Sequence, residues 1–407
     1  MNIFGTHNKK EWSELPARKD FEFLSPGDIY LDSACQTLRP QPVLDAMSLY
    51  FHEYNACGGR VKYEWGKRVD EAVEKTRALV LKRIGKSEKE YQVAFTLNTT
   101  YGLNLLLQQL PQQTYSRMLT SDIEHNSVFL PTTTAANRLA IPRTVLRRNE
   151  DGSLAYAETD LTNAIAVVNA TSSIDGRSLT NAATFANDLH ATSGVLILDG
   201  AQSMVGDAPL LRETDFDALC FSSHKTYGPS LGVIVVKKQL LNSLELSFVG
   251  GGMVAELTED SFTLPTNDPA AALEPGLQDF AGIIGLGAAL NWLGSYRPEG
   301  RSQREQQEKL SRILFEGLSQ LPNIHLLNHE PSSTLSFYSD DIDAHRLAIF
   351  LSKQNIMARS GYFCCHYYLQ NVKKYPPLLR LSVGLHNTEH DVQTTLSVIK
   401  KIMKNIK

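Results

Sequence analysis

The sequence predicts an α/β protein with a large domain built on a mostly parallel sheet and a smaller α+β domain. Three observations support this prediction. The chain has 407 residues, which is too long for one small core. Short apolar runs alternate with helical or loop segments over its first two thirds, an order typical of parallel sheets covered on both faces. The order of elements changes after a helix rich in small residues at 283–293.

The elements of the large domain follow from where apolar residues gather. Helices are expected over 41–56 and 68–84, separated by Gly58 and Gly59, which break the chain. A strand at 92–97 leads into a helix at 103–110. The remaining expected strands are 117–120, 164–169, 195–198, 217–221 and 232–236.

The smaller domain is expected to carry an antiparallel sheet. Its expected helices are 303–320, 342–354 and 388–406, and its expected strands are near 324–327, 334–338, 356–359 and 379–383. We place the large domain at 31–285 and the small domain at 1–30 with 286–407.

Composition narrows the class of protein. Hydrophobic residues make up 42% and charged residues 21% of the chain, which is ordinary for a globular protein. The formal charge is -4 without a basic block, so no nucleic-acid partner is expected. The amino terminus has no apolar core of signal-peptide length and no later stretch is long enough to span a membrane, so the cytoplasm is expected and a membrane is not. Five cysteines without ligand spacing suggest neither disulfides nor a metal site.

Two polar groups follow neighbouring apolar strands and fit pyridoxal phosphate. Asp199 ends the run 195–198, and Lys225 follows the run 217–221. This cofactor needs a lysine for its Schiff base and a carboxylate beside its pyridine nitrogen. Taken singly, such an aspartate is usually a cap and such a lysine a surface charge. Open α/β sheets bind ligands at the carboxyl ends of their strands, and both groups are expected there.

Candidate phosphate ligands lie in the same segments. Thr99 and Thr100 stand at the start of a predicted helix, where free N–H groups favour phosphate, although an ordinary N-cap is an equal alternative. Ser222 and His224 could also hold phosphate, and Gln202 could donate to a ring hydroxyl.

These motifs resemble the class V aminotransferase group of fold type I pyridoxal phosphate enzymes, most closely the cysteine desulfurases and selenocysteine lyases. The family's Asp-Gly-Ala-Gln and Ser-x-His-Lys stand here as 199–202 and 222–225. The resemblance covers nearly the whole chain from Tyr30 onward. It implies a seven-stranded, mostly parallel sheet and a homodimer. It makes Lys225 the Schiff-base lysine and Asp199 the partner of the pyridine nitrogen.

The resemblance assigns roles to further residues. His125, in Glu124-His125-Asn126-Ser127, would stack on the pyridine face, and Asn169 would lie near the ring. Arg380 would bind the substrate α-carboxylate, for which a guanidinium offers two parallel donors. His386 stands where a tyrosine is expected.

The segment Arg359-Ser360-Gly361-Tyr362-Phe363-Cys364-Cys365 is similar to the loop that carries the desulfurase nucleophile. When the segment is matched to this loop, Cys364 stands at the position of the nucleophile, where it would take sulfur from L-cysteine as a persulfide and leave alanine. That role needs an exposed thiol of lowered pKa, which Arg359 or His366 could provide. Cys365 could resolve the persulfide or fill space, and adjacent cysteines bond with difficulty, which favours the second reading.

Departures from the family pattern keep alternatives open. Leu277 stands where a threonine usually reaches the partner subunit's phosphate. The expected function is a cysteine desulfurase acting on L-cysteine, with a sulfur-acceptor protein as possible partner. The alternatives are another class V reaction, such as selenocysteine lysis, transamination or epimerisation, and a catalytically silent scaffold. The product from L-cysteine, alanine or a keto acid, separates the enzymes, and covalent cofactor binding separates both from the scaffold.

Overall fold

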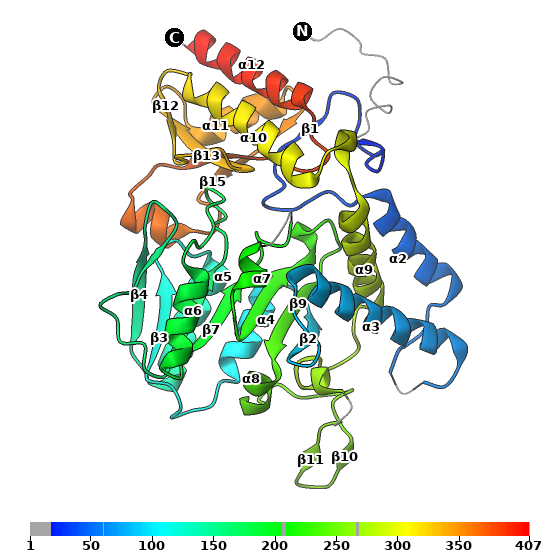
Figure 1. The fold of residues 1–407 in the computed structure, drawn as a ribbon. Helices are drawn as coiled ribbons and strands as arrows, with labels where there is room; N and C mark the ends of the chain where they lie inside the picture. The colour runs from blue at the N-terminus through cyan, green and yellow to red at the C-terminus, as the bar shows by residue number, and fades with distance from the viewer. Residues whose placement is uncertain (1–17, 60, 206–208, 266–267, 407) are drawn as a thin grey trace. The chain divides into compact units, whose positions relative to one another are not determined.

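The computed structural model describes residues 18–59, 61–205, 209–265 and 268–406. The chain forms two compact units (Figure 1). The large unit contains Val43–Thr171 and Ser178–Asn291, and the small unit contains the described part of Met1–Pro42 with Ser172–Arg177 and Trp292–Lys407.

These units differ from the expected boundaries at three places. Residues 31–42 group with the small unit, where Asp32 bridges Ser382. The helix α9 (Phe280–Ser295) runs through the expected boundary at 285 without a break. Ser172–Arg177 also joins the small unit, because its backbone is bonded there: Asn328 Nδ2 donates to Asp175 O at 2.8 Å.

The sheet of the large unit has eight strands among the described residues. In spatial order the strands are β2 (Tyr91–Thr96), β9 (Gly232–Lys237), β8 (Ala218–Ser222), β7 (Val195–Asp199), β6 (Ala164–Asn169), β3 (Arg117–Ser121), β4 (Arg143–Arg148) and β5 (Leu154–Ala155). The five strands from β8 to β4 pair in parallel with one another. β9 is antiparallel to both of its neighbours, and the two-residue edge strand β5, which is antiparallel to β4, is the eighth strand beyond the expected seven.

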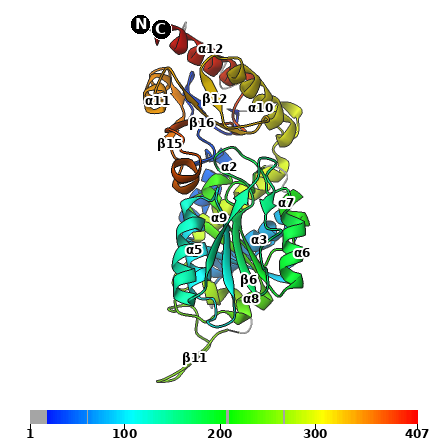
Figure 2. The ribbon, with the colours of Figure 1, turned by 90° about the vertical axis from the view of Figure 1, so that its left-hand side faces the viewer.

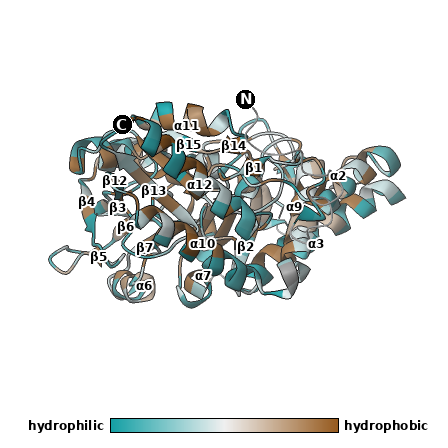
Figure 3. Cartoon of the chain, turned by 90° about the horizontal axis from the view of Figure 1, so that it is seen from above, coloured by the Kyte–Doolittle hydropathy of each residue, from teal (hydrophilic) through white to brown (hydrophobic). Residues whose placement is uncertain are grey.

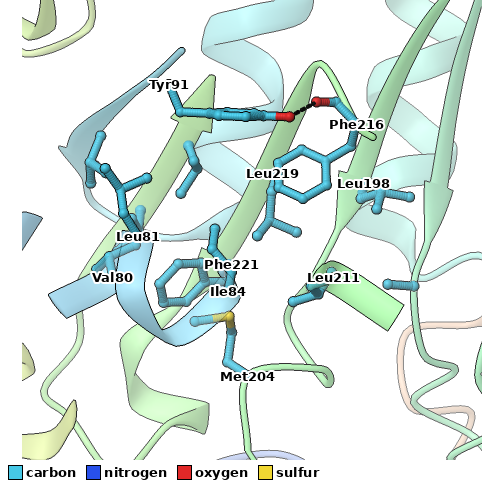
Figure 4. Packing of buried hydrophobic residues seen from close by; sticks show 14 of the residues in the cluster. Val80, Leu81, Ile84, Tyr91, Leu198, Met204, Leu211, Phe216, Leu219 and Phe221 are labelled. Carbon is cyan, nitrogen blue, oxygen red and sulfur yellow. Dashed lines mark hydrogen bonds between the residues drawn. The ribbon is translucent and has the colours of Figure 1, made fainter. Parts of the chain in front are cut away.

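Alternating side chains of these strands fill two separate cores. On β7, Leu196 and Leu198 belong to one core and Ile197 to the other. Successive residues of a strand point to opposite faces, so a strand buried on both faces is apolar throughout. Figure 4 shows the first core, where Leu198 packs with Phe216 and the Tyr91 hydroxyl donates to Phe216 O at 2.8 Å.

Helices cover both faces of this sheet: α3 (Glu64–Ile84), α4 (Thr99–Gln108), α5 (Asn126–Leu139), α6 (Ala182–Ala191), α7 (Pro209–Glu213) and α8 (Lys238–Ser243). The first core includes residues from α3, α6 and α7, and the second includes residues from α4, α5 and α8. Figure 2 shows α5 and α6 on opposite sides of the sheet. A further helix, α2 (Gln41–Glu53), starts at the boundary between the units.

The small unit is built on an antiparallel sheet in the order β12 (Ile324–Leu326), β13 (Thr334–Ser339), β16 (Leu378–Ser382) and β15 (Arg359–Gly361). This confirms the expected α+β arrangement. A two-stranded parallel pair joins β1 (Ile29–Tyr30) to β14 (Ile356–Met357). The packed helices are α10 (Gln303–Ser319), α11 (Ala344–Ser352) and α12 (Glu389–Ile406).

The helices α10 and α11 of the small unit are amphipathic and begin at side-chain caps. Ser302 and Glu305 form a capping box on α10, and Asp343 accepts from two backbone amides at the start of α11. Figure 3 shows both polar and apolar residues around α11. In the described ranges, no helix is both long and apolar enough to cross a membrane.

Candidate active site

Three neighbouring strands of the large unit each end in a polar residue of the predicted site. Asn169 ends β6, Asp199 ends β7 and Ser222 ends β8. Asn169 pairs in register with Asp199, which in turn pairs with Cys220. The parallel register therefore gathers these side chains at one edge of the sheet, as expected for an open α/β sheet.

Asp199 is a buried carboxylate with a lysine as its neighbouring cation. One of its oxygens accepts from Ala201 N at 2.9 Å, and the side chain is 5% exposed. Burial raises the pKa of Asp199, and the positive charge of Lys225 opposes part of that rise. Lys225 lies half-buried in a short 3-10 turn (Ser223–Lys225) directly after β8. This local fold presents the amine beside the carboxylate that the sequence pairs with it.

Ser222 contacts the first turn of α4, which starts four residues earlier than expected. The Ser222 hydroxyl accepts from Thr99 N at 2.9 Å and lies 2.6 Å from Thr99 Oγ1. Asn98 caps the helix by accepting from Tyr101 N. Thr99 is buried by these contacts while Thr100 is exposed. Of the two threonines predicted to lie at the phosphate, Thr100 is the accessible one.

His125 is fixed by a chain of hydrogen bonds that also reaches Thr100. His125 Nδ1 accepts from Ser127 N at 3.1 Å, which places the proton of the neutral ring on Nε2. Ser127 Oγ lies 2.8 Å from His125 Nδ1 and 2.6 Å from Thr100 Oγ1. Ser127 was not predicted as a site residue, although it stands in the same four-residue motif.

Glu124 accepts hydrogen bonds from both the backbone and the side chain of Asn169. Its Oε2 accepts from Asn169 N and Asn169 Nδ2, both at 2.9 Å, and its Oε1 accepts from the Ser121 hydroxyl. The carboxyl is fully buried, and burial raises the pKa of Glu124 to about 7. Glu124 therefore orients the amide of Asn169.

The residues present fit pyridoxal phosphate. Asn169 Oδ1 is buried and has no hydrogen-bond partner among the described residues. A buried polar atom without a partner costs about 1–3 kcal/mol, which a bound donor would relieve. The half-buried Gln202 and His224 lie three residues after Asp199 and directly before Lys225. When bound, this cofactor supplies an electron sink for the substrate's α-carbon.

Arg380, the predicted carboxylate ligand, is buried in the small unit on β16. Its Nη1 donates to Ser173 O at 2.9 Å, and its Nη2 donates to Asp32 Oδ1 at 3.3 Å. Burial lowers the pKa of Arg380, and Asp32 opposes this shift. Neither Ser173 nor Asp32 was predicted as a partner, because both are distant in sequence.

Arg359 lies opposite Arg380 in register on β15, but it contacts another cysteine than expected. Its Nη1 donates to Cys35 Sγ at 3.0 Å and lies 3.6 Å from Asp32 Oδ2. Asp32 therefore faces two guanidinium groups. From the sequence, Arg359 is expected to lie near Cys364, but the Arg359 side chain contacts Cys35 and Asp32.

Cys364 and Cys365 have opposite environments. Cys364 is exposed, and Cys365 is buried with its Sγ 3.3 Å from Ser173 Oγ. Neither cysteine forms a disulfide with a described residue. Cys365 is thus a buried side chain of the small unit.

The predicted site residues are divided between the two units. The cofactor candidates lie in the large unit, and Arg380, Arg359 and Cys364 lie in the small unit. Leu277 is 78% exposed, and His386 is fully buried. Among the described residues, no three or more His, Cys, Asp or Glu side chains are grouped so as to hold a metal ion.

Comparisons with known proteins identify the family of this chain. The family model described as aminotransferase class-V matches residues 29–395. The chain is similar to a probable cysteine desulfurase of Vibrio cholerae, 29% identical over 386 residues that cover 92% of this chain and 93% of that one. It is also similar to a probable cysteine desulfurase of Chlamydia muridarum, 30% identical over 389 residues that cover 93% and 95%.

A solved structure shows the same fold. The apo structure of a cysteine desulfurase from Thermococcus onnurineus has a TM-score of 0.86 at 24% identity, and covers 99% of this chain and 100% of that one. The chain belongs to the class V aminotransferase family. It has the fold type I architecture of that family, whose cofactor is pyridoxal 5'-phosphate.

Proposed function

We propose that this protein is a cysteine desulfurase, which converts L-cysteine to L-alanine and takes the sulfur as a persulfide on Cys364. The observation that carries the proposal is an exposed thiol in the same compact unit as a buried arginine. Cys364 is exposed, and Arg380 is buried and held by Ser173 O and Asp32. An arginine suits a substrate with a free carboxylate, and an accessible thiol suits sulfur transfer. The similarity to proteins named as cysteine desulfurases supports the same reaction.

Each step falls to a residue of this chain. Arg380 binds the α-carboxylate of the substrate. Lys225 would hold the cofactor covalently, and its amine would accept the α-proton and later return it to the α-carbon. Asp199 would keep the pyridine nitrogen protonated, and His125 would stack on the ring. The Cys364 thiolate attacks the substrate sulfur: the S–S bond forms, the carbon–sulfur bond breaks and leaves its electron pair on the β-carbon, and protons taken up at the β-carbon and at the α-carbon complete alanine.

The remaining cofactor contacts are proposed for the phosphate and the ring. Thr100, with Thr99 and Ser222 supporting the first turn of α4, is placed at the phosphate together with His224. Gln202 is placed at the ring hydroxyl. Arg359 would assist at the substrate through Asp32, which it shares with Arg380.

We also propose a cytoplasmic homodimer that passes sulfur to an acceptor protein. The described part of the large unit exposes several large apolar side chains, which a second copy would cover: Leu97, Phe248, Val249, Leu257, Phe262 and Leu277. None of the five cysteines forms a disulfide within the described residues, which suits a reducing compartment. A solution mass of about twice 45.2 kDa by light scattering would support the dimer, and a monomer mass at working concentration would exclude it.

The products from L-cysteine test the activity. We expect the purified protein to release alanine, with sulfur recovered as persulfide or sulfide, and we expect Cys364→Ala to lose most of this activity while keeping the visible absorbance of bound cofactor. Cys57→Ala is the matched control, since that thiol is also exposed but lies in the large unit. Formation of pyruvate alone would replace desulfuration by another class V reaction. Alanine released by Cys364→Ala as fast as by the parent would remove Cys364 as the nucleophile.

A further inference from the structure

Cys364 lies between two buried neighbours. Phe363 is 8% exposed and Cys365 is fully buried, whereas Cys364 between them is exposed. Alternation of this kind projects one side chain outward while its neighbours hold the backbone on either side. The position of the thiol therefore depends on what anchors the two neighbours.

The backbone of this turn is strained. Phe363 has φ of 49° and Cys364 has φ of 57°, so two consecutive residues other than glycine occupy the left-handed region. The turn is closed by Cys365 N, which donates to Tyr362 O at 2.8 Å. Left-handed conformations cost such residues about 1–2 kcal/mol each and persist only where surrounding contacts enforce them. Strong anchors must therefore hold this turn.

Both anchors lead to Arg380. The Phe363 ring lies under the Arg380 guanidinium, with Cζ 4.7 Å from the ring centroid. On the other side of the turn, Cys365 Sγ lies 3.3 Å from Ser173 Oγ, and Ser173 O accepts from Arg380 Nη1. Within the small unit, Arg380 therefore contacts the turn on both sides: directly through Phe363, and through Ser173 to Cys365.

We propose that Phe363 is a positioning residue that fixes the Cys364 thiol for attack through its stacking on Arg380. This inference rests on the proposed function. The face of the aromatic ring matters, because a guanidinium is attracted to the ring's negative face and the attraction is strong at a desolvated site. Phe363 thereby ties the group that binds the carboxylate to the group that takes the sulfur.

The inference predicts an effect on turnover rather than on substrate affinity. Without the ring, Asp32 and Ser173 O still hold Arg380, so carboxylate binding is preserved. The turn, however, loses one of its two anchors, and the strained Cys364 conformation is then less populated. A loss of about tenfold in the rate of sulfur transfer is expected, in line with the strength of a desolvated cation–π contact.

The experiment compares Phe363→Leu with Phe363→Tyr in the holoenzyme with L-cysteine. We expect Phe363→Leu to lower kcat for alanine formation about tenfold with KM within about twofold of the parent, and Phe363→Tyr to restore kcat because it keeps the ring. Single-turnover formation of persulfide at Cys364 should slow to the same extent. Equal rates for Phe363→Leu and the parent, equal losses in both variants, or a loss confined to KM would overturn the inference.

Two controls separate this inference from its premise and from misfolding. Cys364→Ala is assayed in parallel: if it retains activity, the proposed nucleophile fails, whereas an inactive Cys364→Ala with a fully active Phe363→Leu refutes only the role of Phe363. If Phe363→Leu loses bound cofactor or melts at lower temperature, Phe363→Met replaces it as an unbranched side chain of similar reach. The same split between kcat and KM is then required.

Discussion

Lowering the pH should destabilise the small unit through His386. This histidine is fully buried; its Nε2 lies 3.0 Å from Tyr30 O, and its Nδ1 has no partner among the described residues. The ring packs edge-on against Phe21. A proton added at Nδ1 would have no acceptor. Burial therefore lowers the pKa of His386 from 6.5 to about 4, with Arg18 adding to the shift and Tyr30 O and Asp391 opposing it.

The magnitude follows from the two pKa values. Between about pH 6.5 and pH 4 the unfolded chain binds a proton at His386 that the folded chain does not bind. Stability therefore rises with pH through this window and is lost as the pH falls. Each unit of pKa difference is worth about 1.4 kcal/mol, so the loss is about 2 kcal/mol at pH 5 and about 3 kcal/mol near pH 4.

The assay is the free energy of unfolding in urea for the parent and for His386→Gln at pH 8, 6 and 5. The glutamine amide can still donate to Tyr30 O but does not titrate. The contributions of other groups cancel in the difference between the two proteins. We expect that difference to shift by about 2 kcal/mol in favour of the variant from pH 8 to pH 5. A difference that is constant with pH would refute the reasoning.

Three further substitutions probe the site. Arg380→Lys should raise KM for L-cysteine about tenfold or more, because an ammonium group replaces a guanidinium that offers two parallel donors to the carboxylate. An unchanged KM would show that Arg380 does not bind the substrate carboxylate. Glu124→Ala should lower the free energy of unfolding by about 3 kcal/mol, since Asn169 N and Nδ2 lose a buried acceptor, and a loss under about 1 kcal/mol in urea unfolding would contradict this. Lys225→Ala should leave no cofactor mass after borohydride reduction, and a surviving adduct would place the covalent link elsewhere.

Much of the central sheet could be predicted because its strands are continuous apolar runs. β6, β7 and β8 stand close to their expected ranges. The antiparallel direction of β9 could not be predicted, because an apolar run does not show whether a strand runs parallel or antiparallel to its neighbours. α5 also escapes the pattern, because Pro131 lies inside it and a run of threonines interrupts its apolar face. β4 is rich in arginine and gives no strand signal.

The chemistry-bearing residues could be predicted where they follow a strand or stand in a motif. Asp199 and Lys225 are of this kind. The contacts that hold Arg380 could not, because Asp32 and Ser173 are 348 and 207 residues away in sequence. The segment Ser172–Arg177 is compact with the small unit although it follows a strand of the large one. Such long-range pairings depend on the tertiary fold and leave no local pattern.

The most direct test of the central claim is the location of sulfur after turnover. The protein is incubated with L-cysteine, its thiols are alkylated, and peptides containing Cys364 and Cys365 are analysed by mass spectrometry. We expect one additional sulfur atom, on Cys364, formed together with alanine and absent in Lys225→Ala. Sulfur found on another cysteine, or alanine formed with no protein-bound sulfur at any time, would contradict the account.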